Sequence, residues 1–259
     1  MKKLLIALFC LAAIAPMQKG NAQSAINAAE FSPSDHSSMI KFKTLDGTTE
    51  NAFYIPSDSS TGNVLIIFHE QWGLTNDVVK EAEKWKAELG NVDVYAIDMY
   101  AGKVTSDPDI AVKYLKALDD KRSENIIKGL LSRIGADKRI VTLGWGEGGR
   151  WAFKGALLAK EQTVGCVMYY GVPEKEEKNV RGLHADVLYN WASHDKYIQR
   201  PFVDDFGRNV EGTKHKFELH VYDAEPAFAD PSNPKHNAVL TAEADKYTLS
   251  FIKSKFQIE

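Results

Sequence analysis

The stretch Gly144-Trp145-Gly146-Glu147-Gly148-Gly149 joins a mostly apolar run at 139–143 to a helical pattern at 149–158. The first run is typical of a buried strand, and the second of a helix that packs beside it. Glycines at four of the six positions let the chain turn sharply and let two backbones approach closely. The stretch therefore predicts a tight strand-to-helix turn whose backbone N–H groups face outward at the helix N-terminus.

The segments on either side of this turn alternate between strand-like and helical patterns. Further strands are expected at 39–45, 50–55, 63–68, 92–97, 164–170, 186–191 and 216–222. Further helices are expected at 77–89, 110–118, 124–134, 200–209 and 238–256. Strands separated by helices of this length predict right-handed crossovers, and hence an α/β fold. We expect a mostly parallel central sheet covered by helices on both faces, preceded by one hairpin around Asp46-Gly47.

The N-terminus has the pattern of an export signal. Two lysines precede an apolar run at 4–15, which is followed by Pro16 and by the small residues Gly20-Asn21-Ala22. We expect a signal peptide at 1–22 and an exported protein, periplasmic or secreted. The run is shorter than the roughly 20 residues that a permanent bilayer span needs, so no membrane span is expected.

Two further regions follow the expected signal peptide. The stretch 23–38 is poor in large apolar residues and predicts a flexible leader. The stretch 39–259 carries all the expected strands and helices, and its length suits one α/β domain.

Composition argues against several classes of partner and site. The formal net charge is −3, and no dense cluster of Lys and Arg indicates a nucleic-acid partner. Of the two cysteines, Cys10 lies in the expected signal peptide, so Cys166 has no intrachain partner after cleavage. The histidines lack the spacing of metal ligands. We expect no metal and no cofactor.

Recognisable motifs stand where four of the expected strands end, the glycine-rich turn among them, and a further one lies in the loop that carries Asp195. In a mostly parallel sheet, sites gather at the carboxyl ends of strands. The motifs are His69-Glu70-Gln71-Trp72-Gly73, Asp98-Met99-Tyr100, Ser193-His194-Asp195 and Asp223-Ala224-Glu225-Pro226-Ala227-Phe228. Together with the glycine-rich turn, these motifs are the place to look for a site.

The order and spacing of these motifs resemble the dienelactone hydrolase family of α/β-hydrolases, from about residue 39 to the C-terminus. The family's H-E-x-x-G is matched by the motif that begins at His69, its P-D-L-Y by 97–100, and its G-x-C-x-G-G by 144–149. The resemblance implies an α/β-hydrolase fold and hydrolysis of carboxylic esters or lactones. It also implies that the catalytic acid falls on Asp195, the nucleophile on Gly146 and the histidine on Pro226.

Two of these three positions lack the chemistry that the resemblance implies. Glycine offers no attacking atom and proline offers no general base. The carboxylate-binding arginines of the family are absent as well, because Gly102 and Asp230 occupy their regions. The leading interpretation is an exported pseudohydrolase that binds an unknown small molecule or protein partner in the inherited pocket.

Two other interpretations stay open. The chain could be a hydrolase of ester, lactone or related bonds that works without a covalent intermediate, with Glu70 or Asp195 activating water. It could instead be a structural component whose pocket is filled by aromatic side chains. An open cavity beside Gly146 would separate the first two interpretations from this one.

Glu70 and Asp195 could each have a structural role instead of a catalytic one. In the family the position of Glu70 contacts the resting nucleophile, so Glu70 is either a retained acid that points into the pocket or a base whose pKa burial raises. Asp195 is either a catalytic remnant or a buried carboxylate held by loop amides. Its neighbour His194 should project to the opposite side of an extended segment.

The candidate binding residues are Gln71, Trp72, Trp145, Gly146 and Glu147. Trp72 and Trp145 can serve as core aromatics or as a platform for a ligand. The backbone N–H of Glu147 takes the place of an oxyanion donor in a hydrolase. His69, at a strand end, is expected to be packed and hydrogen-bonded.

The glycine-rich turn also satisfies the dinucleotide pattern G-x-G-x-x-G with Gly144, Gly146 and Gly149. A dinucleotide site needs an acidic residue about 20 residues after the glycines to bind the ribose. This chain has Tyr169-Tyr170-Gly171 at that place. The pattern also lies far from the first strand. These two departures argue against nucleotide binding, although an anion at this helix N-terminus remains compatible with the pattern.

Overall fold

The computed structural model describes residues 37–259. The expected signal peptide at 1–22 therefore lies outside the described residues, as does nearly all of the expected leader at 23–38. The first strand begins at Ser38, one residue earlier than expected.

The described chain forms one sheet of eight strands in the order β1-β2-β4-β3-β5-β6-β7-β8. β1 pairs antiparallel with β2, and β2 pairs antiparallel with β4, while every later pair is parallel. The expected mostly parallel sheet is thus confirmed. The strands are β1 (Ser38–Lys43), β2 (Thr49–Ile55), β3 (Asn63–Phe68), β4 (Asp93–Ile97), β5 (Arg139–Trp145), β6 (Thr163–Tyr169), β7 (Asp186–Ala192) and β8 (Phe217–Tyr222).

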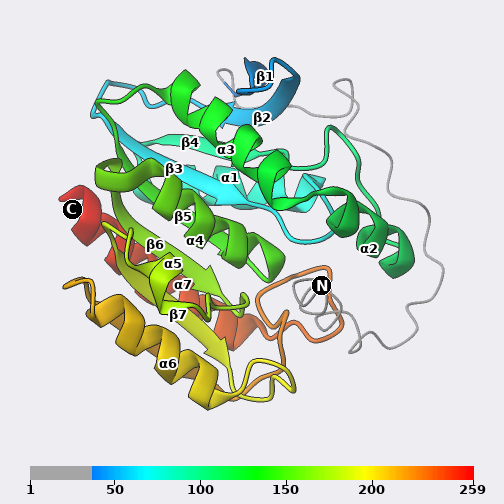
Figure 1. Cartoon of the computed structure of the whole chain (residues 1–259), viewed down its shortest axis with the longest axis vertical. Helices are drawn as coiled ribbons and strands as arrows, with labels where there is room; N and C mark the ends of the chain where they lie inside the picture. Colours follow the sequence, from blue (N-terminus) through cyan, green and yellow to red (C-terminus); the bar gives the residue numbers. More distant parts are fainter. Residues whose placement is uncertain (1–36) are drawn as a thin grey trace.

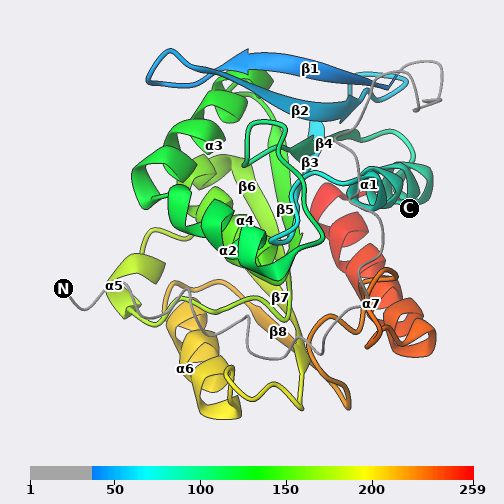
Figure 2. The ribbon, with the colours of Figure 1, turned by 90° about the vertical axis from the view of Figure 1, so that its right-hand side faces the viewer.

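Helices cover both faces of this sheet, as the alternating pattern predicts (Figures 1 and 2). The helices are α1 (Asn76–Leu89), α2 (Pro108–Ala117), α3 (Asp120–Ile134), α4 (Glu147–Ala159), α5 (Glu177–Val180), α6 (Arg200–Glu211) and α7 (Ala238–Phe256), with a short 3-10 turn η2 (Lys160–Gln162). Figure 2 shows α1 and α7 on one side of the sheet and α3, α4 and α6 on the other.

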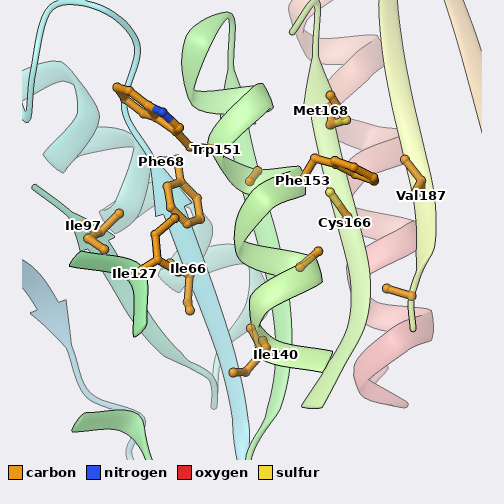
Figure 3. Packing of buried hydrophobic residues seen from close by; sticks show 14 of the residues in the cluster. Ile66, Phe68, Ile97, Ile127, Ile140, Trp151, Phe153, Cys166, Met168 and Val187 are labelled. Atoms are coloured by element: carbon orange, nitrogen blue, oxygen red, sulfur yellow. The ribbon is translucent and has the colours of Figure 1, made fainter. Parts of the chain in front are cut away.

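Each face of the sheet has its own apolar core. Phe68 and Met168 meet Trp151 and Phe153 of α4 on one face (Figure 3). Trp85 of α1 belongs to the cluster on the other face. All six residues of β3 are buried, which explains why that strand reads as an unbroken apolar run. Full burial of one such large apolar side chain stabilises the fold by about 1.5–3 kcal/mol.

Several element boundaries differ from the sequence expectation for identifiable reasons. β5 runs on to Trp145, two residues past its expected end, because that residue still pairs with Tyr169 of β6. α3 begins at Asp120 rather than 124, because the Asp119 carboxylate accepts the Arg122 N–H at 2.7 Å and caps the helix. α5 and η2 are too short to show a periodic pattern.

Candidate functional site

The turn between β5 and α4 has a backbone conformation that side chains rarely tolerate. Gly146 lies at φ +52° and ψ −119°. Its N–H donates to the Tyr169 carbonyl at 2.9 Å, and its own carbonyl accepts the Gly149 N–H at 3.1 Å. The strained geometry in which a hydrolase would present its nucleophile is therefore present. The residue there has no side chain to present.

Close backbone contacts explain the other glycines of this turn. A Cβ added at Gly148 would lie 2.2 Å from the Phe68 carbonyl oxygen, and one at Gly144 would lie 2.1 Å from the Gly148 carbonyl oxygen. Only residues without a Cβ allow the first turn of α4 to approach the end of β3 so closely. The turn is thereby fixed against the loop that follows β3.

His69 joins the loop after β3 to the loop after β4. Its Nδ1 donates to the Glu70 carbonyl at 2.6 Å, and its Nε2 accepts the Met99 N–H at 3.0 Å. The ring is fully buried, and burial lowers the pKa of His69, against the opposing effect of Asp98. The expectation that His69 is packed and hydrogen-bonded is confirmed. Its role is to position the motif that it begins.

Glu70 lies directly beside the glycine of the turn. Its Oε1 is 3.3 Å from the point where a Cβ of Gly146 would stand, and the Gln71 Oε1 is 3.8 Å from that point. Glu70 is buried. Burial, with a smaller contribution from the charge of Asp230, raises the pKa of Glu70 to about 8, although the Tyr170 hydroxyl opposes the change. A carboxyl with such a pKa can hold or release a proton near neutral pH.

A cavity opens at this edge of the sheet, between the loops after β3, β6 and β8. The centre of a water molecule can occupy about 50 Å³ of it, several times the roughly 10–15 Å³ that one water needs. Glu70, Trp72 and Trp145 line the cavity, as the candidate list proposed for a pocket. Gln71 and Gly146 are not among the lining residues, although the side-chain position of Gly146 is next to both Glu70 and Gln71.

The structure places the other two candidates elsewhere. The Asp195 carboxylate is buried, and its Oδ1 accepts the N–H groups of Tyr197 and Ile198 at 2.7 and 2.9 Å. It holds a loop and does not line the cavity. The Glu147 carboxylate accepts a hydrogen bond from the Arg150 Nε at 2.7 Å. Its negative charge is therefore paired with an arginine of the same helix, α4. Only its backbone N–H, at the first position of the helix, stays free of an intrahelical acceptor.

His194 and Asp195 have different partners, but the segment is a turn, closed by the Asp195 N–H on the Ala192 carbonyl at 3.1 Å, and not the extended segment that was expected. His194 Nε2 lies 2.7 Å from Asp223 Oδ1, and both side chains are exposed. Pro226, the position where the resemblance implies a histidine, does not line the cavity either. The three triad positions thus hold a glycine, a proline and an acid bound to loop amides.

Four titratable residues of the cavity lining were absent from the candidates drawn from the sequence. Asp77 and Glu81 come from the first turns of α1, Tyr170 follows β6, and Asp230 follows β8. Asp77 and Glu81 stand four residues apart, which puts them on one face of a helix. That spacing was the available signal, but nothing in the sequence showed that this face turns toward the loop after β8.

The described residues limit two other kinds of site. Between residues 37 and 259, no group of three or more His, Cys, Asp or Glu side chains converges as metal ligands do. No helix in the same part of the chain is both long and apolar enough to cross a bilayer.

Comparison with known proteins identifies the family. The family model described as the dienelactone hydrolase family matches residues 50–256, which is most of the chain and all of the site. The chain belongs to the dienelactone hydrolase family. A relative of this family member in Aquifex aeolicus, named as a carboxymethylenebutenolidase, is 25% identical over 167 residues, which cover 61% of this chain and 72% of the relative.

Solved structures show the same fold for this dienelactone hydrolase family member. A dienelactone hydrolase structure from Klebsiella pneumoniae matches with a TM-score of 0.69 at 17% identity and covers 83% of this chain and 98% of its own. A dienelactone hydrolase-like promiscuous phosphotriesterase from metagenomic libraries matches with a TM-score of 0.70 at 15% identity and covers 85% and 98%. The expected α/β-hydrolase fold is confirmed.

Proposed function

We propose that this family member is a pseudohydrolase: it binds a small molecule in the inherited pocket and does not turn it over through a covalent intermediate. The observation that carries the proposal is Gly146. It adopts a φ of +52° at the head of α4, a conformation that is strained for residues with a Cβ, where a nucleophile would stand, and it has no atom with which to attack.

The hydroxyl groups around the cavity do not replace the missing nucleophile. Thr75, Tyr170 and Ser232 line it, and none of the lining residues is a histidine. The Ser232 Oγ donates to Asp230 Oδ1 at 2.7 Å, which ties it to its own loop. A hydroxyl without an adjacent general base is a poor nucleophile at neutral pH. These contacts support binding without acyl transfer.

The cavity itself argues against a purely structural role. If the site were filled by its own aromatic side chains, no water-sized space would remain beside Glu70. The Trp72, Trp145 and Tyr170 side chains instead form walls around such a space. A partly enclosed pocket with a few polar groups is the usual form of a small-molecule site.

A second function is favoured by the proton affinity of Glu70. Its pKa of about 8 suits a general base that activates a water molecule, and the cavity has room for that water. This alternative is a hydrolase of ester, lactone or related bonds without a covalent intermediate. Glu70 fits it better than Asp195 does, because Asp195 is bound to loop amides away from the cavity.

Covalent labelling tests the proposal. A fluorophosphonate probe modifies activated serine nucleophiles, and a serine esterase in the same reaction serves as the positive control. We expect no labelling of this protein. Labelling at Thr75, Tyr170 or Ser232, read by peptide mass spectrometry, would overturn the pseudohydrolase proposal, because it would reveal a nucleophile.

We also propose that the protein is exported and processed after Ala22. The support is the sequence pattern of Lys2, Lys3, the apolar run at 4–15 and the small residues before Gln23. N-terminal sequencing of the protein from a cell envelope fraction should begin at Gln23. A protein that retains Lys2 and Lys3 in the cytoplasm would contradict export.

A further inference from the structure

The charged groups that line the cavity are all acidic. Glu70, Asp77, Glu81 and Asp230 contribute to the lining, which contains no Lys, Arg or His. Carboxylates that share a partly enclosed, low-dielectric space reinforce one another's potential. Such a space disfavours an anionic ligand and favours a cationic one.

Two of these acids are compensated by lysines and two are not. Glu81 pairs with Lys84 at 2.7 Å, and Asp77 pairs at 3.5 Å with Lys80, an exposed and hence weak contact. Within residues 37–259, no ion pair joins a basic side chain to Glu70 or to Asp230. Asp230 Oδ1 accepts only from the N–H and hydroxyl of Ser232. The two carboxyl groups without a basic partner therefore lie on the loops after β3 and β8, and both are available as anions once the pH exceeds the pKa of Glu70, about 8.

A second observation at the same place points to a missing hydrogen-bonding partner. Tyr170 lines the cavity, and only 3% of its surface is exposed. Its hydroxyl makes no hydrogen bond of normal geometry to any described group. Glu70, which is more than nine-tenths buried, is the acid nearest in effect to this hydroxyl. Buried polar groups in native proteins are nearly always satisfied, so a ligand that donates hydrogen bonds fits here.

The walls of the cavity suit an organic cation better than a metal ion. Trp72, Trp145 and Tyr170 line it with aromatic side chains, whose ring faces attract ammonium groups. The carboxylates do not converge: no three acidic or other ligating side chains in the described chain are grouped to chelate a metal. An alkylammonium ion offers both the positive charge and three N–H donors.

We propose that this cavity binds a small alkylammonium ion, with Glu70 and Asp230 as counter-ions and the tryptophans as walls around its alkyl chain. The inference rests on the proposed function, in which the pocket binds rather than turns over its ligand. It adds the chemical class of that ligand. The positive charge of the ligand should also favour the ionised form of Glu70.

Calorimetric titration with three small molecules of matched size tests the inference. The probes are n-butylammonium, n-butanol and butyrate, at pH 8.5 in dilute buffer, where Glu70 is largely ionised and the amine, with a pKa of about 10, is protonated. We expect n-butylammonium to bind at least about tenfold more tightly than n-butanol, as a favourable charge contact requires, and butyrate to bind most weakly.

Variants locate the binding site. Glu70→Gln and Asp230→Asn each keep the shape of the side chain but remove its charge, and each should weaken n-butylammonium binding at least about fivefold. The matched control is Asp223→Asn, because Asp223 is an exposed acid that pairs with His194. This control should leave the affinity unchanged within about twofold.

The outcomes separate this inference from the proposed function. Equal or tighter binding of n-butanol or butyrate would overturn the ammonium inference and leave a binding function in place. Binding of n-butylammonium that is insensitive to Glu70→Gln and Asp230→Asn would overturn the site assignment. Binding of none of the three probes would contradict the inference, whereas ester turnover that depends on Glu70 would contradict the proposed function alone.

Discussion

The Glu70 carboxylate lies against the empty side-chain position of Gly146, with Oε1 3.3 Å from the point where a Cβ would stand. An acid that is buried and carries no basic partner is costly unless it stays protonated or meets a positive group. Any side chain at position 146 would meet Glu70 first. The glycine and the acid are therefore direct neighbours at the head of α4.

Replacing Gly146 by serine should destabilise the fold. Its φ of +52° is strained for any residue with a Cβ, at a cost of about 1–3 kcal/mol. Chemical denaturation should show a loss of this size in the free energy of unfolding. The control is Gly182→Ser, where a Cβ has no neighbour within 4 Å and φ is not positive. An unchanged stability of Gly146→Ser would contradict the strained turn.

Adding a methyl group at Gly148 should be more damaging, because the clash is with backbone. A Cβ there would lie 2.2 Å from the Phe68 carbonyl oxygen, which cannot move without shifting β3. Gly148→Ala should lower the free energy of unfolding by roughly 3 kcal/mol or more. Gly182→Ala is the control. Equal melting temperatures for the two variants would refute the close contact between α4 and β3.

Glu70 should make the stability of the fold depend on pH. Its folded pKa of about 8 lies above the ordinary value of 4.5, so the folded state holds a proton that the unfolded state releases. The stabilisation from that proton is complete below pH 4.5 and is lost as pH rises through 8.

Glu70→Gln removes this titration, while Asp230 and Tyr170 still face position 70. From pH 4.5 to pH 8, the free energy of unfolding of the wild type should fall relative to Glu70→Gln. The difference should reach a few kcal/mol, at ~1.4 kcal/mol for each pH unit between the two pKa values. Denaturation curves at several pH values measure it. Parallel pH profiles of the two proteins would contradict the raised pKa.

Asp195 should behave as a structural residue. Its Oδ1 accepts two loop N–H groups, and asparagine keeps that oxygen, so Asp195→Asn should retain both stability and ligand affinity. Asp195→Ala leaves two donors unpaired and should cost about 1–3 kcal/mol. Chemical denaturation of both variants measures the two changes in the free energy of unfolding. A loss of ligand affinity in Asp195→Asn at unchanged stability would restore the catalytic interpretation.

Much of the fold could be predicted from local sequence, because its strands and helices have strong and separate patterns. The buried run of β3 and the helix α7 at 238–256 were predicted with their observed bounds. The end of β5 was not, because Trp145 stays in the sheet only through its pairing with Tyr169. Pairing across strands is a tertiary property that a local pattern does not contain.

The candidate site could be predicted only where its residues belong to a motif. Glu70, Trp72 and Trp145 lie in the strand-end motifs and do line the cavity. Asp230 and the α1 acids Asp77 and Glu81 also line it, but they come from segments whose position depends on how the loop after β8 folds back. Glu147 was a candidate by its place in the turn, and its side chain pairs with Arg150 instead.

The most direct test of the pseudohydrolase proposal is the hydrolysis of short-chain esters, thioesters and lactones by wild type and Glu70→Gln, with a Gly146→Cys, Pro226→His double variant as the gain-of-function reference. Binding and backbone donors alone can leave about 10³–10⁴-fold acceleration over water, so the comparison between variants decides. We predict equal, residual rates for wild type and Glu70→Gln, and faster turnover by the double variant. Wild-type turnover that falls at least about tenfold in Glu70→Gln would contradict the proposal and assign Glu70 as a catalytic base.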